Sequence, residues 1–335
     1  LRKIFDDNEI PKTSILPNLS SEDIINLIDV CLKCDAVYVC NSNGKLDKYT
    51  MFILGYLMAM EQEIFLWNDI DESEWLMSCI SKKNNNGYKE VVLTGIHTGH
   101  YGQDLKEYDF SDLLLELEQI DGLERIRISS IEITELTDKF MNVLKTSKKI
   151  VDHIHIPLQS GCDKILKAMN RKYDMQYFIN KINQIRSIRK DIAITSDVIV
   201  GFPGETDEDF NITKENIKKI KFTELHVFPY SKREGTPAAI MKNQIDGNVK
   251  KQRVKELIEV SEELKNEYYK KFIGKSLEVL VETYSDGYLI GHLSNYGKVK
   301  FKGDESLLHN LVMVKLNDYI NDEFMGELIK EEVQV

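Results

Sequence analysis

Two things are scarce in this sequence: cysteines and long apolar runs. Its 335 residues include five cysteines, too few for the disulfide framework of a small secreted domain. No apolar run reaches the roughly 18 residues that a membrane-spanning helix needs, and the apolar stretch MFILGYLMAM (51–60) predicts a buried helix instead. A secretory signal is also missing, so we expect a cytoplasmic protein.

Methionine is absent from the first position, where Leu1 stands, so we expect a processed chain or part of a longer one. Positive charge is in deficit as well, and the net charge of −11 argues against an overall nucleic-acid-binding surface. Residues 231–275 depart from this balance, because they hold eleven Lys and Arg against seven Asp and Glu. The sequence therefore allows a local basic surface.

The fold class that we expect is α/β. Residues 1–80 contain two short apolar strands joined by a loop and a helix, a unit whose strands we expect to be parallel. Residues 85–230 repeat a strand-then-helix pattern about five times. Because a complete eight-fold barrel needs about 250 residues, this region predicts a partial parallel barrel.

The C-terminal region predicts a second, smaller barrel. A linker with a charged helix at 231–270 precedes short alternating strands in 271–335. Several short strands within about 60 residues are typical of a small closed β-barrel of the OB kind. The sequence shows no internal repeat and no low-complexity tract.

Glycine-rich and polar segments follow the expected strands of 85–230, at the edge where parallel α/β folds bind ligands. VIVGFPGETDEDF (198–210) ends a strand in Gly-Phe-Pro-Gly-Glu. Glycines permit close approach by a ligand. The alternative is a tight turn with Thr206 as the helix N-cap.

Two further strands end in polar residues. HIHIPLQSG (153–161) delivers Gln159 to the same edge, while His153 and His155 share one strand face. We favour packing over a metal pair for these two histidines. In VVLTGIHTGH, His97 and His100 stand three residues apart in a loop stretch that holds no cysteine or carboxylate, so they indicate metal only weakly.

These segments together, in this order, resemble the radical S-adenosylmethionine methylthiotransferases. The resemblance is closest to the MtaB-type branch, which thiomethylates threonylcarbamoyladenosine at position 37 of tRNA. The resemblance covers about residues 85–335. It implies that the C-terminal barrel is a TRAM domain, which binds RNA. The matching segments are NGYKEVVLTGIHTGHYGQDL, DGLERIRISSIEITELTD, HIHIPLQSGCDKILKAMNRKY, IAITSDVIVGFPGETDEDF and HVFPYSKREGTPAA.

The resemblance also implies the chemistry. Such enzymes bind S-adenosylmethionine on a [4Fe–4S] cluster and cleave it to a 5′-deoxyadenosyl radical, which abstracts hydrogen from adenine C2 before sulfur and methyl are installed. The loop after VVLT would face the methionine end of the cofactor, and GFPGE would lie near its adenine. The cofactor-binding residues implied by position are Thr94, Gly95, Ser130, Glu132, Gln159, Asp197, Gly201, Pro203, Gly204 and Glu205.

The family's cluster motif is missing. The family holds its cluster with C-x-x-x-C-x-x-C, whose soft thiolates suit iron, and this motif occurs nowhere in the chain. Cys31, Cys34 and Cys40 have another spacing, and we interpret them as structural residues. The sequence therefore identifies neither cluster ligands nor catalytic residues.

The first region resembles a different family. CDAVYVCNSNGKLDKYT followed by LGYLMA is similar to nucleoside 2-deoxyribosyltransferase domains. Where that family has a catalytic Glu, this chain has Ile53, which cannot act as a nucleophile. We expect a foreign segment joined between residues 68 and 86 by a natural fusion, a rearranged gene or a faulty gene model.

tRNA is the partner that the resemblance implies. In the charged helix we expect a solvated face with i, i+4 pairs. Tyr288, Tyr296 and Phe301 are candidates for base stacking, although some of the three must be core residues. The expected phosphate contacts are Lys232, Arg233, Lys270, Lys271 and Lys275. Three functions stay open: a tRNA methylthiotransferase, a non-catalytic tRNA-binding protein on a degenerate barrel, and a nucleoside-processing enzyme.

Overall fold

The structure is a computed structural model that describes residues 37–40, 64–67, 88–95, 98–102 and 108–329. The chain divides into two compact units, Leu1–Leu76 and Met77–Val335. In the first unit, β1 (Val37–Cys40) and β2 (Ile64–Trp67) pair in parallel, as predicted. The helices predicted beside them, together with Cys31, Cys34 and Ile53, lie outside the described residues.

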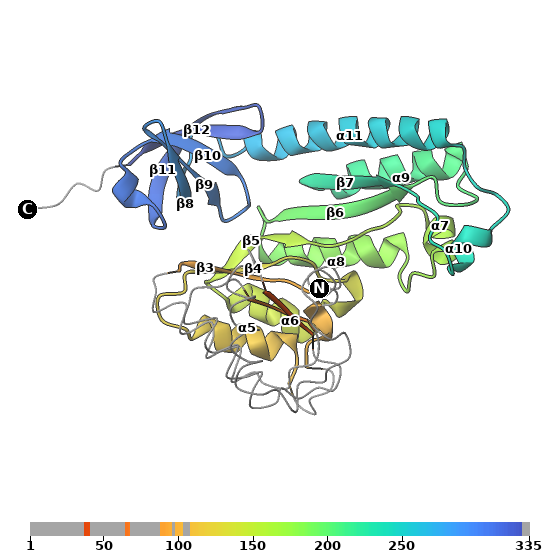
Figure 1. The fold of residues 1–335 in the computed structure, drawn as a ribbon, viewed down its shortest axis with the longest axis horizontal. Coiled ribbons are helices and arrows are strands. Elements are labelled where there is room, and N and C mark those ends of the chain that lie inside the picture. Colours follow the sequence, from red (N-terminus) through yellow and green to blue (C-terminus); the bar gives the residue numbers. More distant parts are fainter. Residues whose placement is uncertain (1–36, 41–63, 68–87, 96–97, 103–107, 330–335) are drawn as a thin grey trace, which may run out of the picture. The chain divides into compact units, whose positions relative to one another are not determined.

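The second unit contains a parallel five-stranded sheet in the order β3-β4-β5-β6-β7 (Figure 1). All five strands predicted between residues 85 and 230 are present, so the predicted partial parallel barrel is confirmed. Their bounds are β3 (Glu90–Leu93), β4 (Arg125–Ile128), β5 (Ile150–His155), β6 (Ala193–Val200) and β7 (Glu224–Pro229).

Helices connect the strands and cover one face of the sheet. Helix α9 begins after Thr206, whose hydroxyl accepts the Asp209 N–H at 3.2 Å, so the predicted N-cap is confirmed. Such a cap stabilises a helix by about 1 kcal/mol. The connecting helices are α5 (Phe110–Glu118), α6 (Asp138–Thr146), α7 (Asp163–Ala168), α8 (Met175–Ile188) and α9 (Asp207–Ile220), with short turns η1 (Thr98–His100) and η2 (Ile133–Glu135).

The two faces of this sheet differ in chemistry. Ile126, Ile154, Ile194 and Val198 are buried on the apolar face. Because side chains alternate along a strand, the residues between them lie on the opposite face, which a closed barrel would turn inward. That face carries most of the polar side chains of the sheet, namely Glu90, Arg125, Arg127, His153, His155, Thr195, Asp197, Glu224 and His226.

A long helix leads to the second barrel. After α10 (Pro237–Ile240), α11 (Gly247–Lys270) packs along β7 and spans about 36 Å at 1.5 Å per residue. The following strands close in the order β10-β12-β11-β8-β9, which confirms the predicted small barrel. Their bounds are β8 (Ser276–Ser285), β9 (Tyr288–Leu293), β10 (Lys298–Lys302), β11 (Leu311–Ile320) and β12 (Glu323–Leu328), with η3 (Glu305–Leu307).

The interior of the small barrel is apolar. Val279, Leu289, Phe301 and Phe324 are at most 1% exposed. Phe301 therefore belongs to the core and cannot stack on a base, as we expected of some of the three aromatic candidates. Among the described residues, the helices are too short or too polar to span a bilayer.

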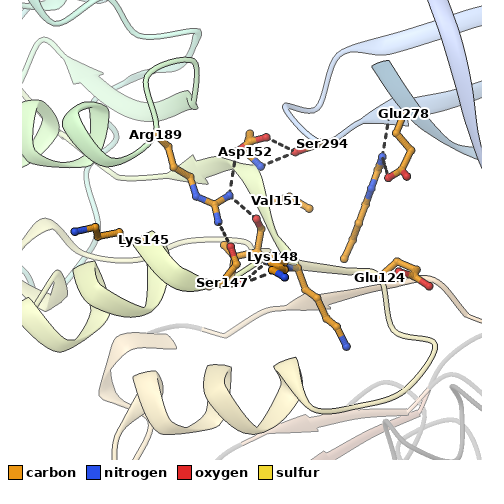
Figure 2. Close-up of a pocket in the computed structure, with 12 residues that line it drawn as sticks. Glu124, Lys145, Ser147, Lys148, Val151, Asp152, Arg189, Glu278 and Ser294 are labelled. Carbon is orange, nitrogen blue, oxygen red and sulfur yellow. Dashed lines mark hydrogen bonds and ion pairs between the residues drawn. The ribbon is translucent and has the colours of Figure 1, made fainter. Parts of the chain in front are cut away.

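The small barrel docks at the amino-terminal ends of β4 and β5. Arg125 donates to the main-chain oxygens of His292 and Glu278, both at 2.9 Å. The Asp152 N–H donates to Ser294 Oγ at 2.7 Å, and that hydroxyl donates to Asp152 Oδ2 at 2.9 Å (Figure 2). A cavity of about 420 Å³ lies beside these contacts. The junction is thus held by specific polar contacts.

Candidate functional site

The Thr195 hydroxyl joins two buried histidines on the polar face of the sheet. His153 Nε2 lies 3.1 Å from Thr195 Oγ1, and His155 Nδ1 lies 2.9 Å from the same oxygen. Burial, assisted by the positive charge of Arg127, lowers the pKa of His153 to about 3, so this ring is neutral near pH 7. Both histidines share a face as predicted, and both are hydrogen-bonded within the sheet.

Asp197 faces a histidine from each neighbouring strand. Its Oδ1 lies 3.1 Å from His226 Nδ1 and 3.4 Å from His155 Nε2. Burial acts to raise the pKa of Asp197, but the hydrogen bonds with both histidines hold it well below its usual range. The hydrogen bond to Asp197 in turn raises the pKa of His226. Asp197 is therefore an anion at neutral pH.

His155, Asp197 and His226 also offer three possible ligand atoms within 4.8 Å of one another. Metal sites use such sets. Here the histidine nitrogens already bond the Asp197 carboxylate, and the second nitrogen of His155 bonds Thr195. We therefore assign the set to hydrogen bonding.

A cavity of about 840 Å³ opens at the carboxyl ends of β5, β6 and β7. Gln159, which has a left-handed φ of 67°, and Asp197 line it side by side, because the Gln159 N–H donates to the Asp197 main-chain oxygen at 2.8 Å. Its volume suits a drug-sized or nucleoside-sized ligand. The remaining lining residues are Ala168, Met169, Asn170, Arg171, Ile199, Phe202, Phe228, Pro229, Tyr230, Ser231, Arg233, Thr236, Pro237, Ala238 and Met241.

The loop Gly201–Glu205 folds around its own acid. The Glu205 carboxylate is buried and accepts the Gly201 N–H and Arg253 Nη1, both at 2.6 Å. Burial raises the pKa of Glu205, while the N–H and the guanidinium act against that rise. Phe202 lines the cavity, whereas its neighbours Gly201, Pro203, Gly204 and Glu205 do not. The cofactor role of those four stays a prediction.

The other predicted rim residues take different positions. Thr94 and Gly95 are exposed beyond β3, and the Ser130 main-chain oxygen accepts the Thr98 hydroxyl. Glu132 is half-buried and pairs with Arg171 at 3.0 Å. Because Arg171 lines the cavity, Glu132 reaches the site through that guanidinium. Of the predicted cofactor residues, the structure thus brings Gln159 and Asp197 directly together.

The predicted phosphate contacts form two groups at opposite ends of α11. Lys232 and Arg233 are exposed before α10, and Arg233 lines the cavity. Lys270 is the last residue of α11, Lys271 and Lys275 follow it, and all three are exposed. Because α11 spans about 36 Å, a single ligand that touches both groups must be a long one.

Sequence reasoning missed three residues of this site: Arg171, His226 and Arg253. A signal existed for His226, because a histidine interrupts the apolar strand ELHVFP at the position that pairs with Asp197 in the parallel register. Arg253 lies in the charged helix, where its pattern matches that of the solvated residues around it. Only the fold shows that it is buried.

Comparison with known proteins gives consistent results. The Radical SAM superfamily matches residues 67–217. The threonylcarbamoyladenosine tRNA methylthiotransferase MtaB of Bacillus subtilis (strain 168) is 51% identical over 236 residues, which cover 69% of this chain and 52% of that protein. The tRNA-2-methylthio-N(6)-dimethylallyladenosine synthase of Desulfitobacterium hafniense (strain Y51) is 40% identical over 260 residues, 76% of this chain and 58% of that protein. The chain therefore spans somewhat more than half the length of these relatives.

The region that the superfamily matches folds as a parallel sheet with a cavity at the carboxyl ends of its strands. The chain therefore has a radical SAM fold. More narrowly, the chain belongs to the radical SAM methylthiotransferase family, so the predicted resemblance is confirmed. The cofactors of this family are S-adenosylmethionine and a [4Fe–4S] cluster.

The described residues fit S-adenosylmethionine but not the iron–sulfur cluster. The ionised Asp197 carboxylate and the Gln159 amide can bind the hydroxyls of an adenosyl group in the 840 Å³ cavity. A cluster needs several thiolates. Cys162, the one cysteine whose side chain is described, is buried, lies 3.5 Å from Asp209 Oδ1, and has its pKa raised by burial. The described residues therefore do not fit the cluster.

Proposed function

We propose that this chain is a tRNA methylthiotransferase that acts on threonylcarbamoyladenosine at position 37, in the anticodon loop. The observation that carries the proposal is the cavity shared by Gln159 and Asp197, in a chain that is 51% identical over 236 residues to a relative named for that reaction. Because tRNA is the proposed substrate, the cytoplasm is the proposed location.

The cavity walls support binding of S-adenosylmethionine. In this proposal the Asp197 carboxylate accepts the ribose hydroxyls, and Gln159 offers both a donor and an acceptor. Phe202 and Tyr230, whose ring centroids lie 5.3 Å apart, supply an aromatic wall for the adenine. Arg171, held by Glu132, adds positive charge.

The two basic groups on either side of α11 support tRNA as the partner. Arg233 lines the cavity and Lys232 precedes Arg233 in the chain, while Lys270, Lys271 and Lys275 lead into the small barrel. A nucleic acid presents a phosphate at every nucleotide and can contact both groups at once. The base to be modified would then lie near the cavity, with the stem along the helix.

Anaerobic reconstitution tests the proposal. Because the described residues supply no set of thiolates for a cluster, the proposal requires that the full chain bind about four iron atoms and four sulfides after reconstitution. It also requires a methylthio nucleoside, which mass spectrometry of tRNA digests detects. Asp197→Asn should keep the iron content and lose the product. Reconstituted protein that binds iron and still forms no methylthio nucleoside would contradict the proposal.

A second candidate is favoured by one specific observation, the missing C-x-x-x-C-x-x-C motif. It is a tRNA-binding protein built on a barrel that performs no chemistry. Its expected outcome is different: no iron after reconstitution, no methylthio nucleoside, and tRNA binding that still weakens with salt. The same preparation therefore decides between the two candidates.

A further inference from the structure

Tyr296 of the small barrel lies against the polar face of the parallel sheet. Its ring centroid is 5.1 Å from that of His153, with the planes inclined by 26°, and 5.2 Å from that of His292. The guanidinium carbon of Arg127 sits 4.5 Å from the same centroid. The ring is thus clamped by two residues of the sheet and one of its own barrel, although the residue is 51% exposed.

The backbone of Tyr296 is unusual for a bulky residue. Its φ of 71° is left-handed, a region that favours glycine and asparagine. The turn around it is well bonded, with the Tyr296 N–H donating to the Leu293 oxygen at 3.0 Å and the Leu293 N–H donating to the Gly297 oxygen at 2.9 Å. An aromatic ring in a strained position points to a role for the ring.

Beyond His153, a hydrogen-bonded chain leads to the cofactor cavity. The ionised Asp197 can only accept hydrogen bonds, so His155 donates to it from Nε2, and we take His155 Nδ1 as the acceptor. The Thr195 hydroxyl then donates to His155 and accepts the Nε2–H of His153. In this arrangement His153 Nδ1 carries a lone pair, and among the described residues it is buried without a hydrogen-bond partner.

The hydrogen-bonded series of side chains ends on one oxygen of Asp197. Both histidine contacts are made by Oδ1, and among the described residues no hydrogen bond is found to Oδ2. Asp197 also lines the cavity. His155 and His226 therefore fix the orientation of the carboxylate through Oδ1, and Oδ2 is available to a ligand.

We propose that Tyr296 is a positioning residue for Asp197, acting through His153, Thr195 and His155. The small barrel thereby completes the cofactor pocket as well as serving RNA. This inference rests on the proposed function, in which Asp197 binds the ribose of S-adenosylmethionine. Tyr296 itself touches neither cavity nor ligand, since it is not among the lining residues.

The test uses the full chain, with S-adenosylhomocysteine as the calorimetric probe because it carries the same adenosyl group. Tyr296→Asn removes the ring but suits the left-handed backbone. We expect this variant to keep its melting temperature while binding the probe about three-fold to ten-fold more weakly. Tyr296→Phe keeps the stack and should bind as the wild type does.

His309→Asn is the matched control. His309 lies in the same barrel, is exposed and has a left-handed φ of 61°, but none of its contacts reaches the sheet. This control should leave the affinity unchanged. Unaltered affinity in Tyr296→Asn, or an equal loss in His309→Asn, would overturn the inference.

Histidine spectra separate this inference from the proposed function. With ¹⁵N-labelled histidine, of which the chain has seven, His153 and His155 should each show a protonated Nε2 in the wild type. Tyr296→Asn should shift both sets of ring nitrogens, and His309→Asn should shift neither. If the wild type binds no S-adenosylhomocysteine, the proposed function fails. The spectra then decide on their own whether Tyr296 orders the hydrogen-bonded side chains His153, Thr195 and His155.

Discussion

Arg253 on α11 reaches 48 residues back along the sequence to donate to the Glu205 carboxylate at 2.6 Å, and both side chains are buried. A second nitrogen of Arg253 pairs with the exposed Asp207 at 2.7 Å. Glu205 also accepts the Gly201 N–H. One guanidinium therefore fastens the loop beside the cavity to the helix that carries the small barrel.

Removing that guanidinium should be strongly destabilising. Arg253→Ala leaves Glu205 as an uncompensated buried charge, and we expect a loss of about 3–5 kcal/mol in the free energy of unfolding by urea titration. Lys255→Ala is the control, because the exposed Lys255 pairs with Glu259 at 3.9 Å and such pairs contribute about 0.5 kcal/mol. Similar small losses in both variants would contradict the structural role of Arg253.

The pair of His226 and Asp197 should make stability depend on pH. The pKa of His226 is raised, so its contribution is complete below its unfolded pKa and is lost as pH rises through the folded value. The pKa of Asp197 is lowered, so its contribution is complete above its unfolded pKa and is lost as pH falls through the folded value. The pair is therefore most stabilising between about pH 4 and 6.5.

We expect His226→Asn to cost more at pH 5.5 than at pH 8.5. His226 is half exposed, so after allowance for solvent screening the difference should be about 0.5 kcal/mol. Urea titrations of both proteins at both pH values measure it. His309→Asn, which removes an exposed histidine of the small barrel, should show no such difference. Equal losses of unfolding free energy for His226→Asn at the two pH values would contradict a pH-dependent contribution of the His226–Asp197 pair.

tRNA binding should weaken with salt. If about four phosphates are neutralised, the plot of log affinity against log salt should have a slope of about −3 to −4. Replacing Lys270 and Lys271 together by alanine should make that slope shallower by about 1 to 2, whereas Lys255→Ala in the middle of α11 should not change it. Filter binding from 50 to 300 mM salt tests this, and an affinity independent of salt would refute phosphate contact.

Two glycines of the same loop should respond differently to alanine. Both have a left-handed φ, 72° at Gly201 and 88° at Gly204. A Cβ at Gly201 would lie 2.1 Å from Lys250 Cγ, while a Cβ at Gly204 would meet nothing within 4 Å. Gly204→Ala should cost about 1 kcal/mol, and Gly201→Ala about 1–2 kcal/mol more. Equal unfolding free energies would show that Lys250 moves aside without penalty.

The regular elements of the second unit could be predicted because local sequence determines them. The alternation of strand and helix patterns gave all five parallel strands, and Thr206 marked the start of α9. The small barrel was likewise visible as short alternating strands. These features depend on neighbours within a few residues, which a single sequence displays.

The contacts that build the site could not be predicted, because they join residues far apart in the chain. Asp197 and His226 meet only through the strand register, and Arg253 is buried although its helix has the composition of a solvated one. Phe301 was one of three candidates for base stacking, some of which had to be core, and only the closed barrel shows that Phe301 is turned inward. Burial and register depend on the whole fold, which composition does not reveal.

Titration of S-adenosylhomocysteine into the wild type and Asp197→Asn tests the central claim most directly, namely that the cavity at the strand ends binds the cofactor's adenosyl group. We predict one site per chain in the wild type and affinity at least about ten-fold weaker in Asp197→Asn, a loss that matches one charged hydrogen bond. Asp286→Asn, an exposed turn residue of the small barrel, should bind normally. Equal affinity in the wild type and Asp197→Asn would contradict the account.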